Sequence, residues 1–315
     1  MAVDPDGNIE WQSPKWMQAR GSHDQTIAVR PTPRGELHIS GCPAKFLQGH
    51  NIFGTDDFVG LLSASFYKLV DCLDLKIGDY EREHIEQGFV NLLRVDVNYS
   101  YSTGCRSNAL SWIRAAELHG HLQHRGRGML SGSSVTWGRG SRYWGLKAYS
   151  KGQEIAAKGH RLPLGCTGRG LEEWADDKLR IELQMRARTL RDHALDVAAN
   201  WKSGTPRDIF LHHLAKLSLS GEARMDTSEL EELPRGVRMT YLAWKAGEDV
   251  RSVVSRPTFY RYRKQLLAHG IDIAVASPNT NANVVPLIRT IEAIPADIPD
   301  WAHGTDLYFD PRRAA

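Results

Sequence analysis

The sequence has little cysteine and no long apolar run. Its four cysteines, Cys42, Cys72, Cys105 and Cys166, are scattered over 315 residues, and no Cys-x-x-Cys pair occurs. This pattern argues against a zinc site and more strongly against a disulfide scaffold, and it fits a reducing cytoplasm. The longest apolar runs are far too short to span a bilayer. No basic and apolar leader follows Met1, so we expect no membrane partner.

Acidic residues are nearly missing from one stretch, although the overall composition is ordinary. With 41% hydrophobic and 24% charged residues, the sequence is that of a soluble globular protein with one large domain or two ordinary ones. Two stretches of the chain, 125–161 and 256–264, are rich in basic residues. In the second, the basic residues are interleaved with Phe259, Tyr260 and Tyr262. Such mixtures suit the phosphates and bases of a nucleic acid, and a solvated charged face explains them about equally well. In the first stretch, 125–161, Glu154 alone opposes Arg125, Arg127, Arg139, Arg142, Lys147, Lys151, Lys158 and Arg161.

Alternation of apolar and polar residues predicts the strands of a sheet. The segments 93–101 and 178–185 alternate cleanly, and 133–151 predicts a hairpin around a Gly-rich basic turn. Apolar residues at helical spacing predict helices over 55–73 and 107–121. The apolar side of a sheet must be buried, so helices should cover it. The sequence therefore predicts an α+β fold: an antiparallel sheet with helices on one face and an open catalytic face.

A polar, Gly-containing segment divides the chain into two predicted domains. The segment 201–206, Trp-Lys-Ser-Gly-Thr-Pro, is typical of a linker, and Pro206 suits the first turn of a new helix. We predict a catalytic domain over residues 1–202 and a mainly helical domain over residues 203–315.

The predicted C-terminal domain contains a pattern that resembles a helix-turn-helix. It consists of a helix at 241–246, a turn at Gly247 and a second helix at 258–269. A helix of this kind can enter a DNA groove, so we predict a DNA-binding role for it. The basic residues that it would offer to DNA are Arg261, Arg263 and Lys264.

One face of the predicted sheet gathers candidate catalytic residues. Tyr149 lies on the polar side of the hairpin, and Asp96 and Glu182 take polar positions on two other strands. Two carboxylates on a shared face can hold a hard cation such as Mg²⁺ or Mn²⁺, with His50 as a third ligand. The cation would polarise a phosphodiester, whose phosphorus the tyrosine could attack. The basic residues predicted to bind the phosphate are Arg142, Lys147 and Lys151.

These residues also have ordinary structural interpretations. Strand carboxylates are usually solvated or paired with arginine, and Arg94 and Arg180 are available for that. The His-x-His pair in 119–121 resembles a metal-binding motif, but it ends a helical pattern, so a frayed helix end is the preferred interpretation. Tyr143 lies roughly 20 Å from Tyr149 along a strand, which is too far for one metal site to serve both.

Several segments, taken together, resemble one known family. They are 43–54 (Pro-Ala-Lys-Phe-Leu-Gln-Gly-His-Asn-Ile-Phe-Gly), 94–96 (Arg-Val-Asp), the hairpin 134–154, 179–182 (Leu-Arg-Ile-Glu), 283–289 and 300–301. On these residues the chain is similar to replication initiators of filamentous phages (inoviruses) of the gene II/X type, and most similar to those of phages of Xanthomonas-like hosts. The resemblance covers about residue 35 to about residue 302.

The resemblance implies a rolling-circle replication initiator in the cytoplasm of a bacterial host. Members nick the plus strand at the origin, become linked through a tyrosine to the 5′ phosphate, and later rejoin the displaced strand. The family tyrosine falls on Tyr149, and Asp96, Glu182 and His50 match family motif positions. The implied cofactor is Mg²⁺ or Mn²⁺. The implied partners are origin DNA, double-stranded and displaced, with host helicase and polymerase.

One feature departs from the family, and it leaves alternatives open. Members begin with an apolar strand before the segment 4–7, Asp-Pro-Asp-Gly, and this sequence starts at Met1, apparently past that strand. Either a downstream start codon was chosen or the strand is absent. A non-catalytic DNA-binding regulator is therefore the alternative function, and a plasmid initiator with the same chemistry is a weaker third hypothesis.

Overall fold

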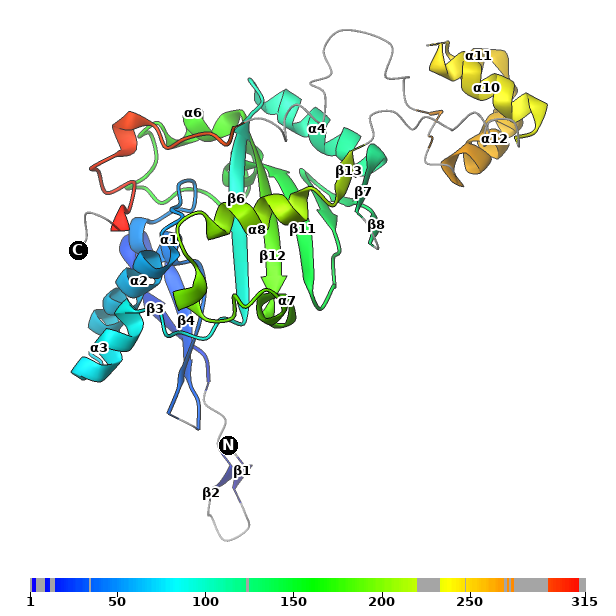
Figure 1. Ribbon diagram of the computed structural model, residues 1–315. Coiled ribbons are helices and arrows are strands. Elements are labelled where there is room, and N and C mark those ends of the chain that lie inside the picture. Colours follow the sequence, from blue (N-terminus) through cyan, green and yellow to red (C-terminus); the bar gives the residue numbers. More distant parts are fainter. Residues whose placement is uncertain are drawn as a thin grey trace.

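A five-stranded antiparallel sheet is the centre of the structure (Figure 1). The computed structural model describes residues 2–3, 9–11, 15–33, 35–122, 125–219, 233–246, 248–268, 271, 273–274 and 294–311. Over this part of the chain the fold is α+β, as the sequence predicts. The central strands, in spatial order, are β6 (Arg94–Ser102), β12 (Lys178–Arg186), β11 (Trp144–Ser150), β10 (Ser134–Trp137) and β9 (Met129–Ser131).

Helices and smaller sheets surround the central sheet. The helices are α1 (Pro43–Gln48), α2 (Phe58–Leu73), α3 (Asp79–Glu86), α4 (Arg106–His119), α5 (Lys151–Ala156), α6 (Leu171–Asp176), α7 (Ala187–Asp192), α8 (Thr205–Leu214), α10 (Arg235–Lys245), α11 (Val250–Val253) and α12 (Arg256–Ala268). The 3-10 helices are η1 (Ser22–Asp24), η2 (Ala198–Asn200) and η3 (Asp300–Ala302). The other strands are β1 (Ala2–Val3), β2 (Ile9–Trp11), β3 (Met17–Arg20), β4 (Thr26–Pro31), β5 (Leu37–Ser40), β7 (Gly120–Leu122), β8 (Gly126–Arg127) and β13 (Leu217–Leu219). Within the described residues, every helix is too short or too polar to span a bilayer.

Alternation along the central strands builds the main hydrophobic core. Leu146 of β11 and Ile181 of β12 point to the same side and are completely buried. Helices α4 and α8 lie across this side and add Trp112 and Phe210 to the core (Figure 1). The prediction that helices cover the apolar face is confirmed, and the opposite face of the sheet is left for polar residues.

The predicted elements have nearly the expected bounds. The strands expected at 93–101 and 178–185 are β6 and β12; β6 is shifted by one residue at both ends, and β12 is one residue longer at its C-terminal end. The helix expected over 55–73 is α2, which begins only at Phe58. The carboxylate of Asp57 caps this helix by accepting a hydrogen bond from the backbone N–H of Gly60 at 2.9 Å.

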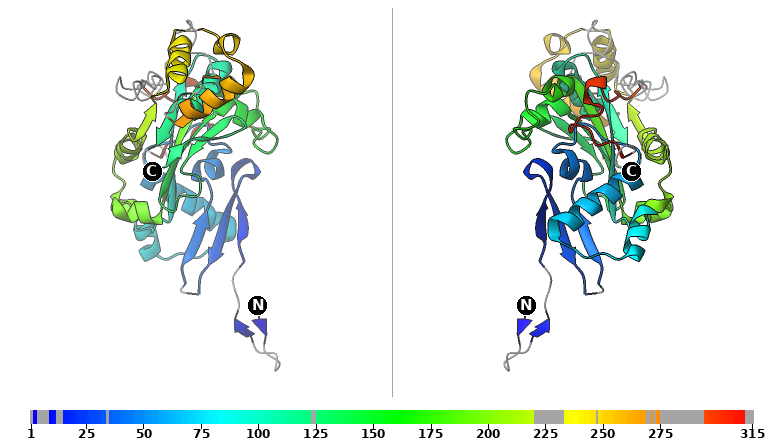
Figure 2. Two further views of the ribbon diagram at one scale, coloured as in Figure 1. Left: turned by 90° about the vertical axis from the view of Figure 1, so that its right-hand side faces the viewer. Right: turned by 90° about the vertical axis from the view of Figure 1, so that its left-hand side faces the viewer.

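The N-terminal part adds a second, smaller sheet. Strands β3, β4 and β5 pair antiparallel in that order, and helices α1 and α2 pack against them (Figure 2). Val29, Phe46 and Leu69 form the centre of this unit and are almost fully buried. Its importance for the site is that α1 leads directly into residues 50–53, which reach the central sheet.

The packing differs from the predicted boundary between residues 202 and 203. Trp201 is buried at 4% exposure, and its indole N–H donates to the carbonyl of Leu195 at 2.9 Å. Beyond it, Phe210 and Leu217 belong to the main core. A Trp-Lys-Ser-Gly-Thr-Pro sequence has the composition of a linker, but a buried tryptophan anchors this segment, and the N-terminal core continues through α8 and β13.

The helices α10, α11 and α12 form a separate core. Tyr241, Trp244, Phe259 and Leu266 are its large buried side chains. A helical C-terminal region is therefore present, but the helix-turn-helix is not confirmed. The short helix α11 stands between the two longer helices, and the predicted turn at Gly247 lies outside the described residues.

The C-terminal segment, residues 294–311, returns to the central sheet. The backbone N–H of Ala296 donates to the carbonyl of Ser100 at 2.7 Å, at the edge strand β6. Further on, Leu307 and Tyr308 join Phe53 in a second hydrophobic cluster, which α5 and α6 complete. In Figure 1 this segment, coloured red, runs beside α6. Residues 294–311 thus pack with Phe53, α5 and α6, beside the central sheet.

Replacing Leu307 by alanine should destabilise the hydrophobic cluster that joins residues 294–311 to Phe53, α5 and α6. The Leu307 side chain is 2% exposed, and the cavity left by Leu307→Ala should cost about 2–4 kcal/mol of unfolding free energy. Ile294 belongs to the same segment but is 79% exposed, so Ile294→Ala should cost less than about 0.5 kcal/mol. Urea unfolding monitored by tryptophan fluorescence measures both changes. Equal effects would contradict the packing described for this segment.

Candidate active site

The polar face of the central sheet carries its side chains in regular rows. Antiparallel register places Tyr149 of β11 opposite Arg180 of β12, and Arg180 opposite Ser100 of β6. One row further along, Lys147 lies opposite Glu182, and Glu182 opposite Asn98. The next row places Gly145, Gln184 and Asp96 side by side. The prediction that Tyr149, Glu182 and Asp96 share one face of the sheet is confirmed, although each lies in a different row.

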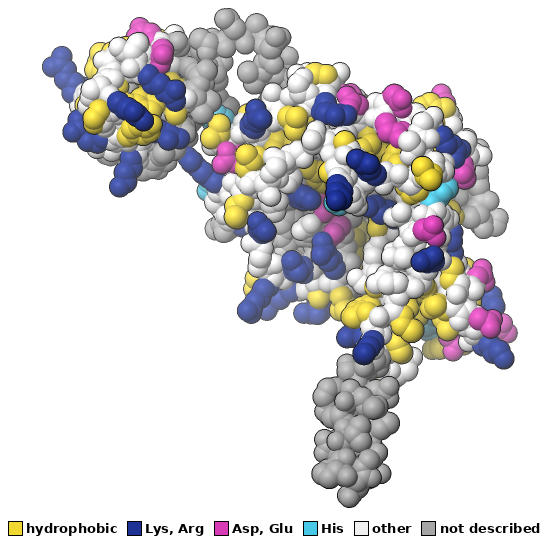
Figure 3. Space-filling model, turned by 180° about the vertical axis from the view of Figure 1, so that it is seen from behind, with side chains coloured by type: hydrophobic (Ala, Val, Ile, Leu, Met, Phe, Trp, Pro, Cys, Tyr) yellow, Lys and Arg dark blue, Asp and Glu magenta, His cyan; other side chains and the backbone are white. Residues whose placement is uncertain are grey.

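This face is open at one end and covered at the other. Asp96 is exposed and Glu182 half-buried, whereas Arg180 and Tyr149 are buried at 3% and 5% exposure. Residues 50–53 cover the row of Tyr149. Figure 3 shows the molecule from this side, with many Lys and Arg side chains and a smaller group of acidic ones. The prediction of an open face is therefore only half right, because a segment from the N-terminal part covers the end that holds the tyrosine.

Arg180 binds residues 50–53, the segment that covers Tyr149, to the central sheet. Its guanidinium donates to the backbone carbonyls of Asn51 and Ile52, and the contact with Ile52 is 2.5 Å long. Its Nε donates to the hydroxyl of Ser100 on the neighbouring strand at 2.9 Å. A guanidinium is planar and holds its five N–H donors in fixed directions, so these contacts set its orientation beside Tyr149.

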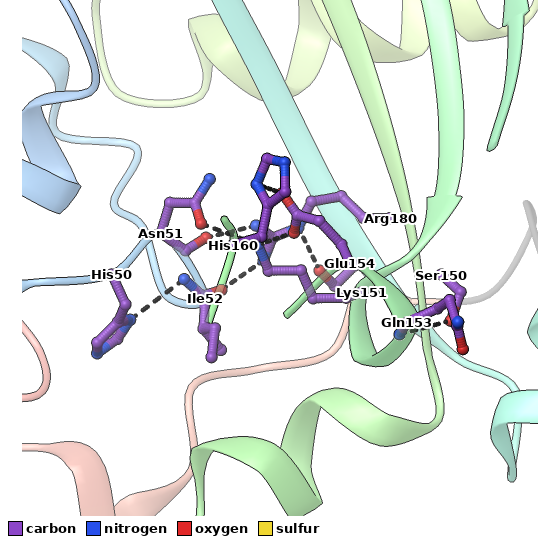
Figure 4. A network of polar contacts seen from close by, with 10 residues as sticks. His50, Asn51, Ile52, Ser150, Lys151, Gln153, Glu154, His160 and Arg180 are labelled. Atoms are coloured by element: carbon purple, nitrogen blue, oxygen red, sulfur yellow. Dashed lines mark hydrogen bonds and ion pairs between the residues drawn. The ribbon is translucent and has the colours of Figure 1, made fainter. Parts of the chain in front are cut away.

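Lys151 ties the same segment to the start of α5. The helix begins after Ser150, whose hydroxyl accepts the backbone N–H of Gln153 at 3.3 Å. Lys151 is completely buried, and its ammonium contacts Glu154 Oε2 at 2.5 Å and Asn51 Oδ1 at 2.8 Å (Figure 4). Burial lowers the pKa of Lys151 to about 7, helped by nearby Arg180 and opposed by Glu154.

Glu154 is held as a carboxylate by two cations. Burial alone would raise the pKa of Glu154, but the ammonium of Lys151 and the guanidinium of Arg180 outweigh it and hold this pKa below its usual range. His160 lies 3.8 Å from the other carboxylate oxygen. Figure 4 shows these side chains converging from α5, β12 and the segment around Asn51. A carboxylate fixed in this way is a candidate proton acceptor near the tyrosine.

The surroundings of Tyr149 favour the protonated form of its phenol. Burial raises its pKa well above the usual value near 10, and the carboxylates of Glu154 and Glu182 act in the same direction. Arg180 opposes this shift. Lys147 also contributes positive charge, because its Nζ lies 4.7 Å from the centre of the Tyr149 ring. Tyr149 therefore lies between two cations that could bind a phosphate and two carboxylates that could accept its proton.

The three predicted phosphate-binding residues have different positions. Lys147 lies on the polar face beside Tyr149, as expected. Lys151 is close to the site but is completely enclosed by Asn51 and Glu154, so in this structure it positions the covering segment. Arg142 is exposed in the turn before β11, at the opposite end of that strand from Tyr149. It does not belong to the same cluster.

The predicted three-ligand metal site is not assembled. Asp96 lies two rows and two strands from Tyr149, roughly 15 Å between Cα atoms. Both of its oxygens accept hydrogen bonds from Arg94, at 2.9 and 2.7 Å, and Glu182 accepts one from Gln184 at 2.7 Å. Among the described residues, no cluster of metal-binding side chains includes these carboxylates. Because these side chains do not fit a bound cation, we derive no step through a metal, and the Mg²⁺ or Mn²⁺ cofactor stays a prediction.

The His50 ring points away from the cluster of Lys151, Glu154 and Arg180 (Figure 4). It is 2% exposed, and its Nδ1 accepts the backbone N–H of Ile52 at 3.2 Å, while its Nε2 is buried without a hydrogen-bond partner. Burial lowers the pKa of His50 to about 4, with the Leu307 backbone opposing the shift and nearby Lys151 and Arg180 adding to it. The ring packs edge-on against Phe53 at 5.6 Å between centroids. In this structure His50 shapes the covering segment.

The predicted DNA-contacting residues of the C-terminal region lie on α12. Arg261 and Lys264 are exposed, and Arg263 is partly buried. The Arg261 guanidinium lies 5.2 Å from the centre of the Tyr262 ring. A basic and aromatic surface therefore exists on α12, as the sequence pattern indicates, and DNA binding by it stays a prediction.

Sequence reasoning missed the roles of three residues. The sequence alone suggests Arg180 only as a partner for a carboxylate, although Arg180 lies on the same face of the sheet as Tyr149 and Glu182. Glu154 was noted only as an isolated acid, yet it stands three residues after Lys151 in the first turn of α5. Asn51 carries no local signal beyond its place in the segment 43–54. Alternation along the strand points to Arg180, and spacing along the helix points to Glu154 as a neighbour of Lys151.

The comparisons with known proteins agree on one family. The family described as the N-terminal part of the phage "Replication-associated protein" matches residues 1–204, and the family described as the C-terminal part of the same protein matches residues 225–307. The chain is 38% identical over 324 residues to the replication-associated protein of Enterobacteria phage I2-2, covering all of this chain and 93% of that protein. It is 23% identical to the replication-associated protein of Salmonella phage IKe, covering 89% of this chain and 79% of that protein. No solved structure matches the chain.

Replacing Lys151 by methionine should remove a pH dependence of stability. Lys151 has a pKa of about 7 when folded and 10.5 when solvated, so between these values the unfolded chain binds more protons than the folded chain. The free energy of unfolding therefore rises with pH in this window. The difference between wild type and Lys151→Met should increase by up to about 1.4 kcal/mol per pH unit from pH 8 to 10, measured by urea unfolding. The hypothesis fails if the exposed control Lys158→Met removes an equal slope.

Proposed function

The chain belongs to the family of phage replication-associated proteins, and from this premise we propose that it initiates rolling-circle replication by nicking the origin. The family supports a role in phage DNA replication. The nicking chemistry is our inference from the polar face of the central sheet. The observation that carries it is the position of Tyr149, between the cations Arg180 and Lys147 and near the carboxylates Glu154 and Glu182.

In the proposed reaction, the Tyr149 oxygen attacks a backbone phosphorus of one DNA strand. The bond from phosphorus to the 3′ oxygen breaks, and the 3′ oxygen leaves as a hydroxyl by taking a proton from water or from the carboxylic acid that has accepted the phenol proton. The phenol proton passes to a neighbouring carboxylate, for which Glu154 and Glu182 are the candidates. The product is a 5′-phosphotyrosine, which conserves the energy of the phosphodiester for the later rejoining of the displaced strand.

The cations have a defined task in this proposal. A phosphoryl group gains negative charge on its oxygens as the nucleophile approaches, and fixed donors stabilise that charge best when water is excluded. Arg180 is fixed by Asn51, Ile52 and Ser100, whereas Lys147 is partly exposed. Arg180 therefore suits preorganised charge stabilisation, and Lys147 suits the first capture of the DNA backbone.

The C-terminal region would position the enzyme on the origin. We assign this role to α12 because Arg261 and Lys264 are exposed there beside aromatic residues. Host helicase and polymerase would act after the nick, extending the free 3′ hydroxyl. Their recruitment is part of the proposal.

Tyr149→Phe should abolish nicking and leave DNA binding unchanged. The substitution removes only the phenolic oxygen, so the ring beneath Lys147 is kept. We expect the rate of nicking of a supercoiled origin plasmid, with Mg²⁺ or Mn²⁺ present, to fall by about 1,000-fold or more. The covalent protein–DNA band on a denaturing gel should disappear. The matched control is Tyr143→Phe, an exposed tyrosine just before β11, which should nick at the wild-type rate.

Two results of that experiment would contradict the proposal. A Tyr149→Phe protein that still forms the covalent adduct would exclude Tyr149 as the nucleophile. A wild-type protein that shifts origin DNA on a native gel but never cuts it would favour the non-catalytic regulator. Mass spectrometry of the peptide attached to a cleaved oligonucleotide identifies the linked residue directly.

Neutralising Arg261 or Lys264 should weaken binding to all DNA sequences alike. If each side chain contacts one phosphate, Arg261→Gln or Lys264→Gln should reduce the slope of log K against log salt by about 1. The exposed Arg235 of α10 provides the matched control, and Arg235→Gln should keep the wild-type slope. Fluorescence anisotropy with labelled duplex at several salt concentrations measures this. Unchanged slopes in both α12 variants would exclude α12 as the binding surface.

A further inference from the structure

Three histidines converge on the side of the sheet opposite to the candidate active site. His193 directly follows α7, and His212 and His213 lie in the last turn of α8. One nitrogen of each ring lies within 4.8 Å of the other two. Among the residues that the structure describes, this is the group of three whose metal-binding atoms come together. The ring centroids are 5.2–5.7 Å apart.

His213 is oriented as a metal ligand. Its Nδ1 lies 2.9 Å from the backbone carbonyl of Ile209, and a carbonyl can only accept, so Nδ1 carries the hydrogen. The lone pair is therefore on Nε2, the nitrogen that is left for a metal. Metal-binding histidines commonly donate their other ring N–H to a carbonyl in this way, which fixes the ring. His213 is 1% exposed and packs edge-on against Trp144, at 4.5 Å between centroids.

The surroundings of the three histidines favour the neutral form of the imidazole, and they leave the group accessible to solvent. Burial lowers the pKa of His213 to about 4, and burial also lowers that of His193, followed by nearby His212 and Lys216. Asp192 acts in the opposite direction on His193. A neutral imidazole has a free lone pair, which a protonated one lacks. His193 and His212 are exposed, so solvent reaches the group.

We propose that His193, His212 and His213 bind one transition-metal ion of the zinc type, with a fourth coordination position open to water. Three imidazoles are a ligand set that suits zinc, copper or nickel, whereas Mg²⁺ prefers oxygen. At bond lengths near 2.0–2.1 Å, tetrahedral ligand nitrogens lie about 3.4 Å apart. The present spread of up to 4.8 Å therefore has to close by about 1.4 Å, which side-chain rotation of the two exposed rings can supply.

The bound ion would join side chains that lie nineteen positions apart in the sequence, at His193 and His212. It would connect the end of α7 to the last turn of α8, and so close the segment that carries the buried Leu195 and Trp201. Helix α8 packs on β6 and β12, the strands that carry Asp96 and Glu182 on their other side. The scarcity of cysteine argues against a thiolate zinc site but does not bear on an imidazole site.

The test uses the full chain without a histidine tag and measures the metal directly. Zn²⁺ is titrated against a chromophoric chelator to obtain stoichiometry and affinity, and Co²⁺ is added in parallel to record the visible absorption of a nitrogen-ligated ion. We expect one ion per chain. Saturating Zn²⁺ should raise the melting temperature by about 5 °C, since a ligand that binds only the folded state stabilises it.

The variants separate this site from casual binding to surface histidines. His193→Gln and His212→Gln change exposed side chains, so the metal-free proteins should melt like wild type. Each should bind Zn²⁺ about 100-fold more weakly and lose the thermal shift. His84→Gln, at a half-buried position on α3 away from the three histidines, is the control for binding to a single histidine and should behave as wild type. No thermal shift in wild type, or equal losses in all three variants, would show an adventitious ion only and overturn the proposal.

Discussion

The candidate site depends on one buried guanidinium. Arg180 lies in the central sheet, and it holds residues 50–53 of the N-terminal part over the row that contains Tyr149. A buried cation is stable only when its donors are satisfied, and the carbonyls of Asn51 and Ile52 and the hydroxyl of Ser100 provide that. The contact that joins the two sheets is therefore the same contact that sets the charge around the tyrosine.

The burial of Tyr149 has a clear chemical consequence. The enclosed phenol holds its proton more firmly than a phenol in water, so in the proposed reaction Tyr149 would lose its proton only within the complex with DNA. A phosphate that enters between Lys147 and Arg180 would bring negative charge, which the two cations balance. Proton transfer to a carboxylate would then occur without bulk water, where each charge–charge interaction is stronger. The covered end of the polar face thus suits the proposed reaction at Tyr149, and the open end suits the first binding of the DNA backbone.

The sequence predicts the sheet well because alternation reports directly on which side of a strand a residue lies. Tyr149, Glu182 and Asp96 were placed on one face for that reason, and the register confirms it. Their rows could not be predicted, since register depends on pairing between distant strands. The burial of Arg180 and Lys151 depends on a segment about a hundred or more residues earlier in the chain. The predicted linker at 201–206 failed because local composition does not reveal that Trp201 is anchored in the core.

The return of the chain end to the first domain bears on how the protein is made. Ribosomes release residues in order, so Ala302, Leu307 and Tyr308, which form one wall of the apolar cluster around Phe53, emerge well after Phe53 and the central strands. Until then Phe53, which directly follows the residues held by Arg180, lacks part of its packing. A nascent or prematurely terminated chain would thus contain β11 with Tyr149 before the hydrophobic cluster around Phe53 is complete. The proposed activity would then wait until residues 302–308 have been made.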